Sequence, residues 1–476
     1  MLLKRFYESK LAQASYLIGC PVSGEALVVD PNRDIDGYIQ AANDEGLKIA
    51  HVTETHIHAD FVSGARELSQ RTGARLYLSD AGGKDWRYGY AGNSKATLLA
   101  DGSRIEVGQV EIRVLHVPGH TPEHLAFLVT DTTTASEPMG MLTGDFLFVG
   151  DVGRPDLLER AALARGSMEE SARQLFRSLQ RIRALPEFLQ IWPGHGAGSA
   201  CGKALGAVPQ STLGYEKRFN WAFAVTDETS FVQAVLEGQP DPPRYFAEMK
   251  RLNREGPRLL GEIRRPPRLL LAELERALND GAAVVDPRPA LEYGRAAVPG
   301  TLNIPGNRSF TTWAGWLLPY DQDFYLIIDE GSGHTVDQLR KDLAGIGLDR
   351  VAGYFGGEVV DAWRASHGQL QTIASLDLAD FAAQVQSNEK IVLDVRGEGE
   401  WNAGHIPGSI NLPVGDLEAR MGELPRHRPL IVHCQTGARA AIAASLLRAR
   451  GFPDVRQFPG GFAEWRAAGK PVEEGG

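Results

Sequence analysis

The sequence predicts an α/β protein with three consecutive domains. A chain of 476 residues is too long for one ordinary domain, and three are a fair expectation for this length. Apolar runs of strand length alternate with polar helical stretches along the chain, which is typical of sheets covered by helices. The C-terminal half also contains an internal repeat, whose two copies of roughly one hundred residues are each long enough for a separate core.

The composition is typical of a soluble globular protein and argues against several other classes of protein. A net charge of −10 does not fit a nucleic-acid-binding surface, which would be basic. No apolar run of about 18 residues occurs, so we expect no membrane span, and residues 1–19 do not resemble a signal peptide. Three cysteines (Cys20, Cys201 and Cys434) are too few for a disulfide framework and suit a reducing compartment. We therefore expect a cytoplasmic protein.

The first domain is expected to span residues 1–245 and to alternate strands with helices. The polar stretches 65–72 and 167–183 are predicted helices. The predicted strands are 14–18, 26–29, 49–53, 75–78, 112–116, 125–129, 141–148 and 189–192. Loops at the ends of such strands are where α/β proteins gather their chemistry.

A proline- and charge-rich stretch, residues 246–267, is predicted to be a helical linker. The repeat follows it. Asp286-Pro-Arg288 recurs as Asp394-Val-Arg396, an offset of 108 residues (394 − 286). The predicted domains are residues 268–370 and 375–476, and their alternation of strands and helices implies parallel sheets.

A candidate metal-binding loop follows the predicted strand at 49–53. It contains His56, His58 and Asp60, and the next position, where a second metal would find another histidine, is Phe61. An aromatic hydrocarbon ring cannot ligate a metal, so the loop favours one ion over two.

Three more candidate ligands stand at strand ends in the same domain. His120 lies in a Pro-Gly turn, Asp145 follows an apolar strand, and His195 repeats the arrangement of strand, turn and histidine. One such turn would be weak evidence. Together with the loop, the three indicate a metal centre.

A second candidate site is the loop that begins at Cys434. An apolar strand ends at this cysteine, and six residues, Cys434 to Arg439, lead into a predicted helix at 440–449. Inward-facing backbone N–H groups, the helix N-terminus and Arg439 would stabilise a thiolate. A thiolate can attack a sulfur donor and hold the transferred sulfur as a persulfide.

The middle copy of the repeat is predicted to lack this chemistry. Aligning Leu326–Glu330 with Leu430–Cys434 places Glu330 at the thiol position, and residues 331–335 contain no arginine. A carboxylate cannot carry sulfane sulfur. We therefore expect residues 268–370 to be inactive and to serve spacing, docking or dimer contact.

The first domain resembles the metallo-β-lactamase superfamily, whose signature is His-x-His-x-Asp-His with later His, Asp and His ligands. The resemblance covers roughly residues 1–230 and is strongest to the persulfide dioxygenases. It implies an αββα sandwich. Supporting segments are Gly119–Pro122, Gly144–Phe148, Gly153–Asp156 and Ser211–Asn220. Three positions depart from the family pattern: Phe61 for the last histidine of the signature, Pro155 for threonine and Lys217 for arginine.

Carried over by position, the family's iron ligands fall on His56, His120 and Asp145. Such a set leaves positions open for substrate and O₂, as in non-haem Fe(II) oxygenases. The resemblance implies one Fe(II) per chain. The remaining polar residues would orient ligands and water, namely His58, Asp60 and His195. A competing assignment makes His58 a fourth ligand of zinc.

The Cys434 loop resembles the rhodanese family over about residues 375–470. Supporting matches are Asp394-x-Arg396, Gly404–Gly408 and Gly460–Trp465. A six-residue loop implies sulfur transfer, since the related phosphatases carry a longer one. In this resemblance Cys434 and Arg439 are the catalytic residues, and the middle copy is a degenerate rhodanese-like domain.

The combined resemblance implies a sulfide-detoxifying enzyme. Its first domain would oxidise a thiol persulfide, of the glutathione or coenzyme A class, to sulfite with O₂. Cys434 would transfer sulfane sulfur to form or consume thiosulfate. Candidate substrate-binding residues are Cys201, Arg154 and Lys217, and relatives suggest a homo-oligomer. Two alternatives stay open: a zinc thioesterase of the glyoxalase II kind with non-catalytic rhodanese domains, and a sulfur-carrier protein.

Overall fold

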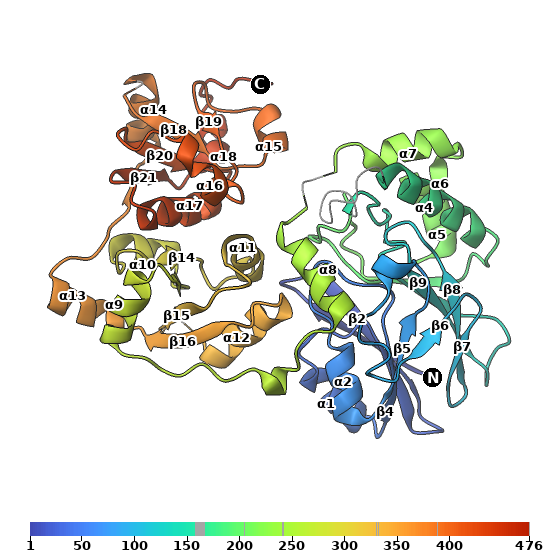
Figure 1. Ribbon diagram of the computed structural model, residues 1–476. Coiled ribbons are helices and arrows are strands. Elements are labelled where there is room, and N and C mark those ends of the chain that lie inside the picture. Colours follow the sequence, from blue (N-terminus) through green and yellow to red (C-terminus); the bar gives the residue numbers. More distant parts are fainter. Residues whose placement is uncertain are drawn as a thin grey trace. The chain divides into compact units, whose positions relative to one another are not determined.

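The computed structural model describes residues 1–157, 167–203, 205–239, 242–329, 331, 333–387 and 389–475 (Figure 1). The chain divides into two compact units. The first comprises residues 1–263 with 344–347, and the second comprises 264–343 with 348–476. No helix in the described part of the chain is both long and apolar enough to cross a membrane.

The first unit contains two sheets that pack face to face. Among the described residues, the first sheet has six strands in the order β1-β2-β3-β4-β5-β6. They are β1 (Leu2–Glu8), β2 (Gln13–Cys20), β3 (Glu25–Val29), β4 (Lys48–Thr53), β5 (Arg75–Ser79) and β6 (Thr97–Leu99). The second sheet, counted over the same described ranges, has six strands in the order β12-β11-β10-β9-β8-β7. They are β7 (Arg104–Val107), β8 (Val110–His116), β9 (Leu125–Asp131), β10 (Gly140–Gly144), β11 (Gln190–Pro193) and β12 (Ser211–Thr212).

Helices cover the outer faces of both sheets. Leu17 and Val28 of the first sheet share a buried cluster with Tyr38 of α1 (Asp36–Asp44) and Leu68 of α2 (Ala65–Thr72). On the second sheet, the outer cluster includes residues of α4 (Met168–Ile182) and α7 (Glu228–Leu236). The shorter helices of this unit are α5 (Leu213–Phe219) and α6 (Trp221–Ala224). A third apolar cluster fills the space between the sheets. The predicted αββα sandwich is therefore confirmed.

One strand prediction for this unit needs correction, and four observed strands were not predicted: β1, β6, β7 and β12. The predicted strand 141–148 is shorter, because β10 ends at Gly144, whose φ of +49° turns the chain and places Asp145 in a loop. Strand β1 is absent from the prediction, since its charged side chains interrupt the apolar alternation, yet it pairs along its whole length with β2.

The predicted linker is largely part of the first unit. Helix α8 (Tyr245–Glu255) buries Tyr245, Phe246, Met249 and Asn253, and the unit extends to Ile263. Only a short stretch before α9 (Leu271–Asn279) lies between this unit and the next folded element.

The second unit contains two sheets, both parallel. In the described part of the middle copy the strand order is β14-β13-β15-β16. Its elements after α9 are β13 (Ala283–Asp286), α10 (Ala290–Arg295), β14 (Leu302–Asn303), α11 (Phe310–Leu317), β15 (Phe324–Ile328), α12 (Val336–Gly345), β16 (Val351–Gly356) and α13 (Val359–His367).

The described C-terminal copy has the order β17-β21-β20-β18-β19. Its elements are β17 (Ala374–Ser375), α14 (Leu378–Ser387), β18 (Ile391–Asp394), α15 (Glu398–Asn402), β19 (Ile410–Asn411), α16 (Leu417–Arg420), β20 (Leu430–His433), α17 (Ala438–Ala449), β21 (Val455–Phe458) and α18 (Gly461–Ala467). The order β19-β18-β20-β21 reproduces β14-β13-β15-β16, so the sequence repeat is also a repeat of topology.

The strand register corrects the alignment that placed Glu330 at the thiol position. Val285 pairs with Leu326, and its counterpart Leu393 pairs with Val432. Leu326 therefore matches Val432, an offset of 106 (432 − 326), and Ile328 takes the position of Cys434. The middle copy has two additional residues between β14 and β15, which changes the offset between the copies from 108 to 106. Glu330 itself lies outside the described residues, and the position still carries no thiol.

Candidate metal centre and thiolate loop

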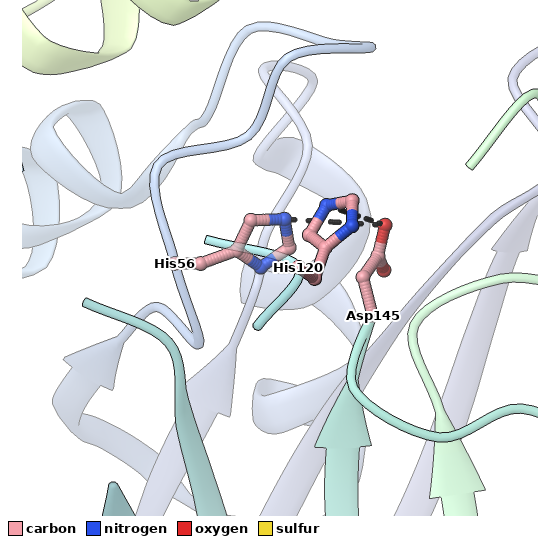
Figure 2. A group of neighbouring side chains, drawn as sticks. All are labelled: His56, His120 and Asp145. Carbon is pink, nitrogen blue, oxygen red and sulfur yellow. Dashed lines mark ion pairs between the residues drawn. The ribbon is translucent and has the colours of Figure 1, made fainter. Parts of the chain in front are cut away.

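Three predicted ligands converge at one edge of the sandwich. His56 follows β4, His120 follows β8 and Asp145 follows β10. The Nε2 atoms of His56 and His120 lie 3.9 and 3.6 Å from Asp145 Oδ2. Figure 2 shows both rings turned toward this carboxylate. All three side chains are buried, and their ligand atoms lie within 4.8 Å of one another.

Hydrogen bonds fix both imidazoles in the form that binds a metal. The Thr55 hydroxyl donates to Asp30 Oδ2 at 2.8 Å, so it accepts from His56 Nδ1 at 2.9 Å. His120 Nδ1 donates to the Arg154 carbonyl oxygen at 3.0 Å. With both Nδ1 atoms protonated, each Nε2 lone pair faces Asp145.

Burial keeps both imidazole rings neutral, and several acceptor atoms of the group have no hydrogen-bond partner. It lowers the pKa of His56 well below its usual value and also lowers the pKa of His120. His56 Nε2 and both carboxylate oxygens of Asp145 are buried without a hydrogen bond. Unpaired buried acceptors are costly, and a cation coordinated among them would remove that cost. The residues present therefore fit a metal ion.

Small residues and a further histidine hold Asp145 in place. The Asp145 N–H donates to His124 Nε2 at 3.0 Å, and the His124 ring stacks on His56. A Cβ atom at Gly194 would stand 2.8 Å from Asp145 Oδ1. Asp30 and His124 were not predicted from the sequence. Asp30 directly follows β3, so the strand-end rule that found the other candidates also applies to it.

A second group of side chains lies on the other side of Asp145. His195 Nε2 is 3.4 Å from Asp145 Oδ1 and 3.1 Å from Asp60 Oδ2. The buried Cys201 thiol completes this group. Phe61 is fully buried and packs against His58, so no imidazole is available at its position.

His58 turns away from the three converging ligands. Its Nε2 lies 3.1 Å from Asp30 Oδ1. Burial opposes its charged form, but the Asp30 carboxylate outweighs burial and raises the pKa of His58 to about 9. Its Nδ1 is buried without a hydrogen bond.

The structure does not place the three candidate substrate-binding residues on an open surface of the site. Cys201 is 1% exposed, so it does not line a mouth, and burial raises the pKa of its thiol. The Arg154 guanidinium is fully buried and forms a bidentate pair with Asp156. Lys217 Nζ donates to the Leu185 carbonyl oxygen. Arg154 contributes to the centre through its carbonyl oxygen instead.

The Cys434 loop joins β20 to α17. The Gly437 N–H donates to Cys434 Sγ at 3.1 Å, and Gly437 adopts a φ of +89° that favours glycine. Helix α17 begins at Ala438, two residues earlier than predicted, so Arg439 lies in its first turn. A backbone donor and a helix N-terminus both face this thiol, as a thiolate site requires.

Two ion pairs surround the loop. Arg439 forms a bidentate pair with Glu400 of α15, with distances of 2.5 and 2.8 Å. Glu400 was not predicted to contact the loop. Arg396 pairs with Asp394, and both are buried. The middle copy repeats the second pair between Arg288 and Asp286.

Comparisons with known proteins agree with this architecture. A family profile described as the metallo-beta-lactamase superfamily matches residues 10–195, and one described as a rhodanese-like domain matches residues 377–468. The chain is similar to a crystal structure of a metallo-beta-lactamase from Staphylococcus aureus subsp. aureus COL. Identity is 42%, coverage is 75% of this chain and 99% of that chain, and the TM-score is 0.67.

The chain is also similar to two further proteins. The crystal structure of ETHE1 from Myxococcus xanthus is 25% identical, covers 53% of this chain and 98% of that chain, and gives a TM-score of 0.43. The hydroxyacylglutathione hydrolase of Rhodospirillum rubrum is 29% identical over 185 residues, which is 38% of this chain. The match spans 60% of that hydrolase's length. The fold, the converging ligands and these matches show that the chain belongs to the metallo-beta-lactamase superfamily and carries a rhodanese-like domain after its metallo-beta-lactamase domain.

Proposed function

We propose that this protein is an iron-dependent persulfide dioxygenase that also transfers sulfane sulfur through Cys434. The observation that carries the proposal is the convergence of His56 Nε2, His120 Nε2 and Asp145 Oδ2, all buried. Two imidazoles and one carboxylate are the ligand set of non-haem Fe(II) oxygenases, which leaves positions open on the ion. An Fe(II) ion held by these side chains would supply the redox chemistry that couples a persulfide sulfur to O₂.

The surrounding residues favour a single ion. Phe61 replaces the imidazole that a second ion would use, and His58 Nε2 is occupied by Asp30. Hydrogen bonds from Nδ1 orient His56 and His120, so the ligand geometry is set before any metal arrives. Burial of the whole group keeps bulk water away from the reacting sulfur.

The proposed oxidation balances as R–S–SH + O₂ + H₂O → R–SH + H₂SO₃. The terminal sulfur gives up four electrons, and O₂ accepts them. In the second reaction the Cys434 thiolate attacks the terminal sulfur of another persulfide and releases the thiol. Sulfite then removes this sulfur from Cys434 as thiosulfate and regenerates the thiolate. The same residues serve the reverse direction, in which thiosulfate supplies the persulfide.

We further propose that the three predicted domains divide this work. The first carries the metal centre, and the C-terminal copy carries sulfur transfer. The middle copy is a degenerate rhodanese-like domain, because a buried isoleucine, Ile328, occupies the register position of Cys434. Placing both reactions on one chain raises the effective concentration of sulfite near the second thiol.

A second candidate function is a zinc thioesterase. The similarity to a hydroxyacylglutathione hydrolase favours it. So does the unpaired Nδ1 of His58, which a fourth ligand of zinc would use. In that case the Cys434 domain would be non-catalytic. The third alternative, a sulfur carrier, would need Cys434 and not the metal ligands.

Metal content and oxygen uptake test the proposal directly. Protein purified without oxygen should contain one iron per chain and should consume O₂ when glutathione persulfide is added. His120→Ala should abolish O₂ uptake and leave the sulfur transfer of Cys434 unchanged. Stoichiometric zinc, hydrolysis of S-lactoylglutathione and no O₂ uptake would instead identify the thioesterase. Oxygen uptake that survives His120→Ala would contradict the ligand assignment.

A further inference from the structure

The loop that carries His56, His58 and Asp60 is buried although its backbone is irregular. It runs from Glu54 to Gly64, between β4 and α2. Buried backbone polar groups need partners, and an irregular loop cannot supply them itself. In its first half, the Thr55 N–H donates to Asp30 Oδ1 at 2.6 Å. The Ile57 N–H donates to Glu123 Oε1 at 2.7 Å.

In the second half of the loop, the Val62 and Gly64 N–H groups donate to the carbonyl oxygens of Gly345 and Pro31, and the Asn253 side chain supplies three further hydrogen bonds. Its Nδ2 donates to the carbonyl oxygens of His58 at 2.8 Å and Phe61 at 2.7 Å. Its Oδ1 accepts from the Ser63 N–H at 2.9 Å. The three partners fix the orientation of the amide, because a flipped amide would oppose donor to donor and acceptor to acceptor.

Within the described residues, every hydrogen bond of the Asn253 side chain goes to this loop. It lies inside α8 and does not cap it, and the other buried residues of this helix are Tyr245, Phe246 and Met249. An amide on an apolar helix face is costly unless it is hydrogen-bonded, and the loop provides these bonds. Helix α8 also lies beyond residues 10–195, the span matched by the family profile.

We propose that Asn253 is a positioning residue for the metal centre. By holding the carbonyl groups of His58 and Phe61, it fixes the backbone on which Asp60 stands. The Asp60 carboxylate lies 3.1 Å from His195 Nε2, which in turn faces Asp145 Oδ1. Helix α8 is therefore part of the metal site. This inference rests on the metal site of the proposed function, but it does not depend on the reaction or on which divalent metal is native.

The test compares two variants of the full chain on the same helix face. Asn253→Asp preserves size and the acceptor for Ser63 but removes both donations to the loop. Met249→Ala removes a buried apolar contact and no hydrogen bond to the loop. We expect Asn253→Asp to weaken Co(II) binding about 10- to 100-fold, the range for residues that orient metal ligands, and to shift the visible bands of bound Co(II). Met249→Ala should leave Co(II) affinity per folded protein within about twofold of the unchanged chain, because it alters no ligand contact.

Co(II) affinity is measured by chelator competition, with the folded fraction taken from circular dichroism. Asn253→Ser, whose hydroxyl retains one donor, should show an intermediate loss and provides the comparison if Asn253→Asp does not fold. Unchanged affinity and spectrum in the Asn253 variants would overturn the inference, as would an equal loss in Met249→Ala. A chain that binds Co(II) normally but never oxidises persulfide would refute the proposed function alone. A chain that binds no Co(II) would refute both.

Discussion

The middle and C-terminal copies of the repeat share a four-strand scaffold but differ at the loop that carries Cys434. Both contain the same order of parallel strands and the same Asp–Arg pair, Asp286 with Arg288 and Asp394 with Arg396. In the C-terminal copy, four residues, 434–437, separate β20 from α17, which brings the N-terminus of this helix to Cys434. In the middle copy, seven residues, 329–335, separate β15 from α12. The scaffold is thus maintained without the thiolate site, so fold and chemistry are separable here.

The largest expected effect comes from removing the thiol. Cys434→Ser should lower thiosulfate formation from persulfide and sulfite by at least about 10³-fold, because an alcohol cannot hold sulfane sulfur. Oxygen uptake should remain unchanged. Sulfur transfer is measured by thiosulfate production. Residual sulfur transfer in this variant would mean that Cys20, Cys201 or the middle copy takes part. It would contradict the proposal that only the C-terminal copy transfers sulfur.

Matched substitutions of the two Asp–Arg pairs separate stability from activity. Asp394→Asn should destabilise the chain by about 3–5 kcal/mol, since it leaves the buried Arg396 with a weaker partner, and Asp286→Asn should cost less because Arg288 is only partly buried. Urea denaturation followed by circular dichroism measures this loss. Only Asp394→Asn should reduce sulfur transfer. Equal loss of transfer in both variants would mean that the middle copy takes part in it.

Acid should weaken the C-terminal copy more than the middle one. Burial lowers the pKa of His433 to about 4, from an ordinary value near 6.5. The unfolded state therefore binds the proton first, so stability is full above pH 6.5 and is lost as pH falls toward 4. The loss amounts to about 3 kcal/mol at most. Leu326 matches Val432, so the apolar Ile327 matches His433 and the middle copy has no such dependence.

Denaturation of His433→Phe between pH 7 and pH 4 provides the measurement. Its stability should decline less steeply with acid than that of the unchanged chain. Identical slopes would show that another group governs acid sensitivity.

The smallest effect is expected at Glu400, whose carboxylate pairs with Arg439 and neutralises part of its charge. The pair is partly exposed, so it is worth at most about 1 kcal/mol. Glu400→Gln should lower KM for sulfite or thiosulfate by up to about fivefold, because more of the arginine charge becomes available to a dianion. Steady-state kinetics over a range of ionic strength provides the measurement. A rise in KM would show that Glu400 serves to hold Arg439 in place.

The residues that the sequence predicted are those that follow apolar strands. His56, His120 and Asp145 stand at such ends, and the structure brings them together. The residues that hold these ligands in place could not be predicted in the same way. Asn253 lies almost 200 residues (253 − 56) from His56, in a segment whose proline and charge content predicted a linker. Hydrogen bonds between distant segments leave no periodic signal in one sequence.

The register of the repeat shows a related limit. Matching motifs give the correct offset near Asp286 and Asp394, where no insertion intervenes. Beyond β14 two extra residues shift the offset, and apolar strands such as β15 can be slid by two positions without changing their pattern. Only strand pairing identifies Ile328 as the counterpart of Cys434.

The position of helix α8 decides where this protein can be cut. The resemblance of the first domain to persulfide dioxygenases covers roughly residues 1–230, so a fragment stopping at 245 would look like a complete domain. Such a fragment would lose Asn253 and release the carbonyl groups of His58 and Phe61 from their partner. A truncation intended to isolate the first unit for crystallisation or directed evolution should therefore retain at least the chain through Ile263, and residues 344–347 also belong to that unit.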